Sequence, residues 1–276
     1  MKHAFEPATC IGATLRLLVK VHLIYFADQP SDILLQIEAA HGNDQVPLDA
    51  KLNFSNPTET FVVAGEESIG VRRWLKVDGQ FDCMYVASVD VVRADADLSD
   101  CAQAKLSSLP SDVTKFLMPS RYCNPEDFFA FTAGQFGHLS GGAVIVAMSD
   151  WINAHFKYDI DVSNAATSAS QSFQLRAGVC RDFAHVLIAM ARAVGVPARI
   201  VSAYAPDVSP QDFHAVVEVY LEDGWHLIDP TGMARASEIV RIGVGRDAAD
   251  VSFLTSYGDL LLKKQTVEIS RVAKPT

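Results

Sequence analysis

The segment 171–204 reads QSFQLRAGVCRDFAHVLIAMARAVGVPARIVSAY. Within it, residues 180–194 are apolar on nearly every side, a pattern that predicts a helix buried inside a core. Its few polar positions are Arg181, Asp182, His185 and Arg192. We expect this helix to end at Gly195, because glycine readily adopts the left-handed conformation that closes a helix. The residues that follow, ARIVSAY, are typical of a strand.

Cys180 would occupy the N-terminus of this helix. Unpaired backbone N–H groups and the positive end of the helix dipole meet there, and both favour a nucleophilic thiolate. The same N–H groups could stabilise an oxyanion. Gly178 would allow the sharp entry of the backbone into the helix. Taken alone, Cys180 is more simply a small apolar filler, since free cysteines are often buried and inert.

A second informative segment, residues 214–230, reads HAVVEVYLEDGWHLIDP. Residues 215–221 and 225–229 are rich in β-branched and aromatic side chains, and the Glu-Asp-Gly sequence between them is typical of a turn. We therefore expect a β-hairpin in which His214 opens the first strand and Asp229 closes the second.

The length of the turn decides whether the two ends of the hairpin can meet. Val216 lies opposite Asp229 if the turn consists of residues 222 and 223 alone. His214 is then a diagonal neighbour of Asp229 on the same face of the sheet. A turn that is one residue longer would place the two side chains on opposite faces.

These three residue types supply the parts of a nucleophilic acyl-transfer site. A cysteine thiolate attacks, a histidine acts as base, and a carboxylate holds the imidazole and stabilises its charged form. Singly, each residue has an ordinary explanation; an Asp before Pro, for example, favours turns. The joint pattern makes Cys180, His214 and Asp229 the predicted catalytic residues.

Two segments resemble the core of the transglutaminase-like superfamily: residues 178–204, GVCRDFAHVLIAMARAVGVPARIVSAY, and residues 214–232, HAVVEVYLEDGWHLIDPTG. The resemblance is to the bacterial branch described as cysteine proteases, and its strong part covers roughly residues 145–235. Members of this branch often carry Trp two residues after the histidine, where this chain has Val216. The difference leaves the triad intact and concerns the shape of the neighbouring acyl pocket.

The resemblance implies an α+β fold with a papain-like core, in which a buried Cys-bearing helix packs on an antiparallel sheet behind an all-β N-terminal domain. It implies Cys180 as nucleophile, His214 as base and Asp229 as orienting acid. The expected reaction is acyl transfer on an amide or peptide bond through a thioester, most simply hydrolysis by water. A protein-glutamine transglutaminase and a non-catalytic binding module are the alternatives. A zinc enzyme built on Cys180 and His214 lacks further ligands at suitable spacing.

The second oxyanion donor is left open by the sequence. The backbone N–H of Cys180 is the preferred first donor. Trp151, Gln171 and Gln174 precede it, and Trp or Gln side chains serve this role in related enzymes, but no motif selects one of them. The pattern around Trp151 favours a core position.

The residues before this core are mainly strand-like. Alternating or β-branched runs separated by turn-like segments suggest a sandwich or half-barrel. The expected strands are 15–26, 33–38, 61–64, 68–77 and 81–93, and the expected turns include 41–44, 55–57 and 77–80.

Helical periodicity begins after Pro125, over residues 126–135 and 144–156, and residues 161–170 are expected to form a loop. We divide the chain into a β-sandwich-like domain (1–110), a transglutaminase-like catalytic core (111–250) and a C-terminal strand segment (251–276). The packing partner of the last segment is not predicted.

Composition excludes several function classes. With 33 acidic and 23 basic residues, the chain has a formal net charge of −10, unlike the basic footprint of a nucleic-acid-binding protein. No apolar run approaches the roughly 18 to 20 residues of a membrane span. The first ten residues lack the apolar region of a secretory signal. We expect a soluble cytoplasmic protein; its oligomeric state is not predicted.

The cysteines form an odd and scattered set, Cys10, Cys83, Cys101, Cys123 and Cys180. No two have the short spacing of a zinc ribbon or a redox pair. We therefore expect reduced cysteines, no metal and no cofactor. Among other polar residues, His185 is expected to be buried, and Arg246, Asp247 and Asp250 to be solvated rather than a cation site.

Overall fold

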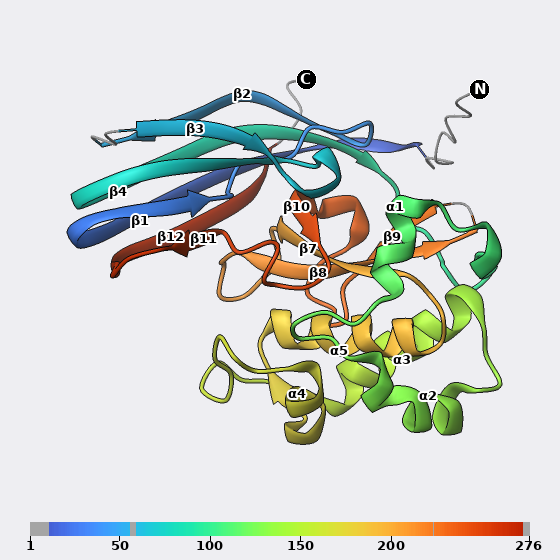
Figure 1. Cartoon of the computed structure of the whole chain (residues 1–276). Coiled ribbons are helices and arrows are strands. Elements are labelled where there is room, and N and C mark those ends of the chain that lie inside the picture. Colours follow the sequence, from blue (N-terminus) through green and yellow to red (C-terminus); the bar gives the residue numbers. More distant parts are fainter. Residues whose placement is uncertain (1–10, 56–58, 223, 273–276) are drawn as a thin grey trace.

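The structure is a computed structural model that describes residues 11–55, 59–222 and 224–272. Figure 1 shows three layers: an outer β-sheet, an inner β-sheet, and helices beneath the inner sheet. Both large sheets are antiparallel, and the cysteine-bearing helix packs against the inner one. The predicted α+β class, with a β-rich N-terminal region, is confirmed.

The outer sheet has six strands, and β1 and β4 form its centre. Buried and outward-facing positions alternate along β1, where Leu17, Val19, Val21 and Leu23 all point into the core. This period of two is what a half-buried strand requires. The strands are β1 (Ile11–Leu35), β2 (Gln45–Phe54), β3 (Glu59–Ala64), β4 (Val71–Arg93), β11 (Leu254–Ser256) and β12 (Leu261–Val272).

The expected turn at residues 77–80 is wrong, because β4 runs through it without a break. Its partner strand is irregular instead. Ala27 pairs with Gly79 and Ser31 pairs with Val77, so residues 28–30 of β1 bulge outward opposite one residue of β4. A bulge of this kind lets a long ribbon bend without ending. The sequence analysis did not predict β2, because it contains Pro47 and Asp49. Both residue types are disfavoured in strands, and proline is tolerated mainly at a sheet edge, where β2 lies.

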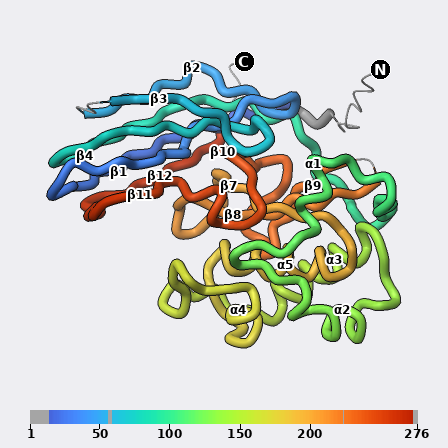
Figure 2. The backbone as a smooth tube through the Cα atoms, viewed as in Figure 1, coloured from blue at the N-terminus to red at the C-terminus, as the bar shows by residue number. Residues whose placement is uncertain are grey.

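The C-terminal strands complete the first sheet. Both β11 and β12 pair antiparallel with β1, and β12 does so along most of its length. Figure 2 shows the red end of the chain lying beside the blue start. The packing partner that the sequence left open is therefore β1.

The inner sheet lies between the outer sheet and the helices (Figure 1). Its order is β10-β7-β8-β9. Ile200, Val217 and Val219 share a core with the helices, whereas Tyr204 and Ile242 share one with the outer sheet. The strands are β7 (Ala198–Tyr204), β8 (His214–Leu221), β9 (Gly224–Ile228) and β10 (Val240–Gly245).

Helix α5 is the most buried helix of the described chain, with every residue from Asp182 to Arg192 buried. As predicted, the left-handed Gly195 lies just beyond its end. The helices are α1 (Ser111–Thr114), α2 (Phe129–Phe136), α3 (Gly141–His155), α4 (Ala169–Leu175) and α5 (Cys180–Ala193). A two-residue parallel pair, β5 (Lys157–Tyr158) and β6 (Ala177–Gly178), lies before α5.

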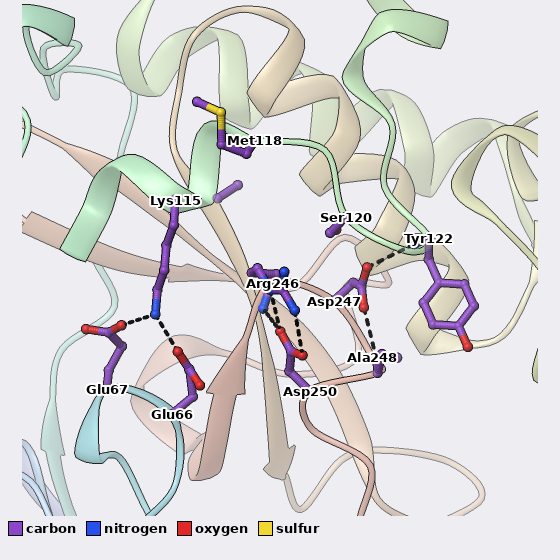
Figure 3. A network of polar contacts seen from close by, with 12 residues as sticks. Glu66, Glu67, Lys115, Met118, Ser120, Tyr122, Arg246, Asp247, Ala248 and Asp250 are labelled. Carbon is purple, nitrogen blue, oxygen red and sulfur yellow. Dashed lines mark hydrogen bonds and ion pairs between the residues drawn. The ribbon is translucent and has the colours of Figure 1, made fainter. Parts of the chain in front are cut away.

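Short 3-10 turns complete the connections: η1 (Glu66–Ser68), η2 (Leu106–Ser108), η3 (Lys115–Leu117), η4 (Pro125–Phe128) and η5 (Ala236–Glu238). Figure 3 shows a polar contact between two of them. Lys115 of η3 pairs with Glu66 and Glu67 of η1, between β3 and β4. No helix within the described ranges is long and apolar enough to span a membrane.

Candidate active site

Cys180 is the first residue of α5, as the sequence predicts. The chain turns sharply where it enters α5. This turn is closed by Asp182, whose buried carboxylate accepts the Val179 N–H at 2.8 Å. Gly178 is required here, because a Cβ at this position would lie 2.6 Å from Cβ of Asp182. The glycine lets the chain pass close to the Asp182 side chain and brings Cys180 to the helix N-terminus.

His214 and Asp229 meet across the β8–β9 hairpin. Leu221 pairs with Gly224 and Val217 with Ile228, so the register is that of the two-residue turn; one of its residues, Asp223, lies outside the described residues. The same register puts His226, opposite Val219, on the other face from His214, as expected. Nε2 of His214 lies 2.9 Å from Oδ2 of Asp229, and their side chains are 0% and 1% exposed.

Asp229 is held by more than the histidine. The backbone N–H of Thr231 donates to Oδ1 at 2.9 Å, and the Ala234 N–H donates to Oδ2 at 2.9 Å. The Thr231 hydroxyl donates to the same carboxylate, at 2.8 Å from Oδ1. The sequence analysis missed Thr231 and Ala234, although an Asp followed by Pro-Thr-Gly signals a turn in which the aspartate binds backbone N–H groups.

The other ring nitrogen of His214, Nδ1, is buried. Among the described residues, no group forms a hydrogen bond with it. Cys180 nevertheless interacts with this ring. Burial opposes the charged imidazolium, but the Asp229 hydrogen bond and the interaction with Cys180 outweigh it and raise the pKa of His214 to about 10. The structure thus brings all three predicted residues together, with the imidazole between the thiol and the carboxylate.

Tyr158 is a fourth residue at this site, and the sequence analysis did not select it. Its phenol interacts with both the thiol and the backbone N–H of Cys180. The tyrosine comes from β5, a strand of two residues, which is too short to leave a periodic pattern in the sequence.

The candidates for a second oxyanion donor lie elsewhere in the structure. Trp151 packs among aromatic rings, 4.8 Å between centroids from Phe131, as the core interpretation predicts. The Gln171 side chain accepts the Ser168 N–H at 2.8 Å and so caps α4. Gln174 is exposed. Within the described chain, none of these three side chains forms a hydrogen bond with Cys180.

The remaining polar residues near α5 have structural partners. His185 is buried, accepts the Ala248 N–H at 3.1 Å, and has a pKa lowered by burial to about 4. Arg181 binds Ser163 Oγ at 2.6 Å. Arg246 pairs with Asp250 at 3.0 Å (Figure 3). Residues 11–55, 59–222 and 224–272 contain no cluster of His, Cys, Asp or Glu that could hold a metal ion.

The cysteines differ in accessibility. Cys180 and Cys101 are partly exposed, whereas Cys83 and Cys123 are buried. Burial raises the pKa of the Cys83 and Cys123 thiols to about 12, which disfavours their reaction. Cys10 lies outside the described residues. Cys101 therefore serves as an internal reference for Cys180.

Comparison with known proteins gives the same family as the motifs. Residues 132–230 match the transglutaminase-like superfamily. A curated relative, an uncharacterized protein of Mycobacterium leprae (strain TN), is 30% identical over 118 residues. This match covers 39% of the present chain and 42% of the relative, so the chain spans less than half of that protein's length.

Among solved structures, a protein of Cytophaga hutchinsonii, provisionally named a cysteine protease, is similar over almost the whole chain. It is 28% identical, with a TM-score of 0.88 over 96% of this chain and 93% of the other. The periplasmic domain of TgpA from Pseudomonas aeruginosa is more distant, at 18% identity and a TM-score of 0.43 over 81% of this chain and 91% of that domain. The first match includes both the outer sheet and the core.

Proposed function

Because residues 132–230 match the transglutaminase-like superfamily, we propose that the protein is a cysteine-dependent enzyme that hydrolyses an amide or peptide bond through a thioester. The observation that carries the proposal is the buried His214–Asp229 pair at 2.9 Å, placed beside a cysteine at the N-terminus of a buried helix. Cys180 is the nucleophile, His214 the base and Asp229 the group that orients it.

In the first half-reaction Sγ of Cys180 forms a bond to the carbonyl carbon, and the carbonyl π electrons move onto oxygen. His214 holds the thiol proton as imidazolium, and Asp229 stabilises that charge. When the C–N bond breaks, the imidazolium proton passes to the leaving nitrogen. A thioester on Cys180 and a free amine are the products.

In the second half-reaction a water molecule attacks the thioester carbonyl. Neutral His214 takes a proton from the water, and the C–S bond breaks. The products are a carboxylic acid and the thiolate–imidazolium pair of the resting enzyme. An amine in place of water would give a transglutaminase from the same intermediate, so the acceptor and not the triad separates the two outcomes.

The experiment is an alkylation profile of the cysteines with iodoacetamide between pH 5 and 9, read residue by residue by mass spectrometry. An ordinary thiol, with a pKa near 8.5, is only about 1% thiolate at pH 6.5. A thiolate–imidazolium pair should therefore let Cys180 react roughly 10- to 100-fold faster than Cys101 at that pH. His214→Ala should abolish the advantage, leaving the Cys101 rate unchanged as an internal control.

Equal reactivity of Cys180 and Cys101 in the wild type would contradict the proposal and favour the non-catalytic binding module. If the advantage is present, incubation with an amide substrate in the presence and absence of a primary amine separates hydrolysis from amine transfer. A cytoplasmic location, where the thiol would stay reduced, remains a prediction that fractionation of the source cells would check.

A further inference from the structure

Tyr158 is fixed beside the entry to α5 by backbone pairing. β5 and β6 run parallel, with Tyr158 opposite Gly178. The Asp159 N–H donates to the Gly178 carbonyl at 2.9 Å, on the C-terminal side of the tyrosine. The Lys157 N–H donates to the Arg176 carbonyl, also at 2.9 Å, on its N-terminal side. Tyr158 is thus held opposite Gly178, the residue two positions before Cys180, by hydrogen bonds on both sides.

The ring of Tyr158 is also held by packing on α5. It contacts the Phe183 ring at 6.0 Å between centroids, one helical turn beyond Cys180. The side chain is partly buried, and its hydroxyl interacts with Cys180. Burial, followed by the charge of Cys180, raises the pKa of Tyr158, so the phenol stays protonated and able to donate.

The phenol lies beside the group expected to be the first oxyanion donor. Its oxygen interacts with the Cys180 backbone N–H, the group expected to stabilise the developing oxyanion. A substrate carbonyl oxygen that accepts from this N–H would therefore lie next to the hydroxyl.

We propose that Tyr158 is a catalytic residue that donates its phenolic hydrogen bond to the substrate oxyanion, together with the backbone N–H of Cys180. The proposal rests on the proposed function, because an oxyanion forms only if Cys180 attacks a carbonyl. No proton is transferred. The C=O π electrons move onto oxygen as the S–C bond forms, the oxyanion accepts both hydrogen bonds, and the carbonyl re-forms when the leaving group departs.

The test compares two reactions of the same thiol. Acylation of Cys180 by p-nitrophenyl acetate passes through an oxyanion, whereas alkylation by iodoacetamide displaces iodide at a saturated carbon and forms none. In Tyr158→Phe the ring and its packing on Phe183 remain, and only the hydroxyl is lost. Acylation of Cys180 should fall roughly 100- to 1,000-fold, the usual cost of one oxyanion donor, whereas alkylation should change far less, through the lost contact with the thiol alone.

Tyr220→Phe is the matched control. Tyr220 is also partly buried and packed on an aromatic ring, Trp225, at 5.3 Å, but it lies six residues along β8 from His214, about 20 Å in an extended strand. Both reactions should keep wild-type rates in this variant. Mass spectrometry assigns the acyl group to Cys180, and Cys180→Ser gives the background.

Three results would overturn the assignment. Wild-type acylation retained in Tyr158→Phe shows that the hydroxyl does not stabilise the oxyanion. An equal fall of acylation and alkylation shows that Tyr158 only positions the thiol. A wild-type protein that is alkylated at Cys180 but never acylated overturns the proposed function and the role of Tyr158 with it.

Discussion

At the scale of single residues, the orientation of the imidazole depends on how rigidly Asp229 is held. Oδ2 of Asp229 accepts from His214 and from the Ala234 N–H, and Oδ1 accepts from the Thr231 N–H. The Thr231 hydroxyl lies within 2.9 Å of both oxygens and also accepts the Met233 N–H. The carboxylate is therefore held in place by its own surroundings, which is the preorganisation that the proposed triad requires.

Thr231 is accordingly expected to be a positioning residue. Thr231→Val keeps the shape of the side chain and removes the hydroxyl that donates to Asp229. A hydrogen bond to a charged group contributes about 1.5–3 kcal/mol, so hydrolysis should slow roughly 10- to 100-fold. The advantage of Cys180 over Cys101 in alkylation at pH 6 should shrink as well, because the imidazolium is less well stabilised.

Thr231→Ser is the control, since serine retains the hydroxyl and should retain most of the rate. A Thr231→Val protein with an unchanged pH profile of Cys180 alkylation would show that the threonine acts on folding alone. Thermal unfolding of both variants separates a loss of stability from a loss of orientation.

At the scale of elements, the sequence predicted the parts of the site that carry long, regular patterns. The ends of α5 follow from an apolar run and a glycine. The register of β8 and β9 depended on the length of the turn, which the sequence left open and the structure shows to be two residues. The β5–β6 pair could not be predicted from the sequence, because a strand of two residues shows no periodicity. The bulge in β1 was missed for a different reason: Gly79 looks like a turn residue unless its partner strand is known.

Replacing Gly178 tests whether the backbone must pass close to the Asp182 side chain where it enters α5. In Gly178→Ala the new methyl group would lie 2.6 Å from both Cβ and Oδ2 of Asp182, inside van der Waals contact. The carboxylate would have to leave the Val179 N–H that it now accepts. Overpacking of this kind costs about 1–3 kcal/mol, so we expect a loss of that size in the free energy of unfolding measured with urea.

Gly134→Ala is the control in the same experiment, and it should change the free energy of unfolding in the opposite direction. Gly134 lies inside α2, and a Cβ there would meet nothing within 4 Å. Alanine should therefore stabilise the protein by about 0.5–1 kcal/mol through helix propensity. The geometric argument for Gly178 would be refuted if both alanine variants changed stability in the same direction and by the same amount.

At the scale of the whole molecule, a chain of charged side chains links the two sheets. Glu218 of β8 accepts from Arg199 of β7 at 2.7 Å and from Arg241 of β10 at 2.8 Å. Arg241 also pairs with Asp44, next to β2, which accepts from Arg93 of β4 at 2.7 Å. The chain therefore runs from the middle of the inner sheet to the outer sheet, through a region where Glu218 is 1% exposed.

Burial alone would raise the pKa of Glu218, but Arg199 and Arg241 outweigh burial and lower it to about 2. A carboxylate whose pKa is lower in the folded state stabilises the fold fully above its unfolded value near 4.5. That contribution is lost as the pH falls from about 4.5 towards 2. Acid should therefore weaken the link between the sheets in this pH range.

Glu218→Gln leaves the buried Arg199 without its counter-charge and Arg241 with Asp44 alone, so it should lower the free energy of unfolding at pH 7 by about 3–5 kcal/mol. The difference from wild type should shrink below pH 4.5, because the wild-type carboxyl is then itself becoming protonated in the unfolded state and, nearer pH 2, in the folded state. Glu268→Gln, at an exposed position of β12, should stay within about 0.5 kcal/mol at every pH. A Glu218→Gln deficit that is constant from pH 7 to pH 2.5 would mean that shape and not charge joins the two sheets at this point.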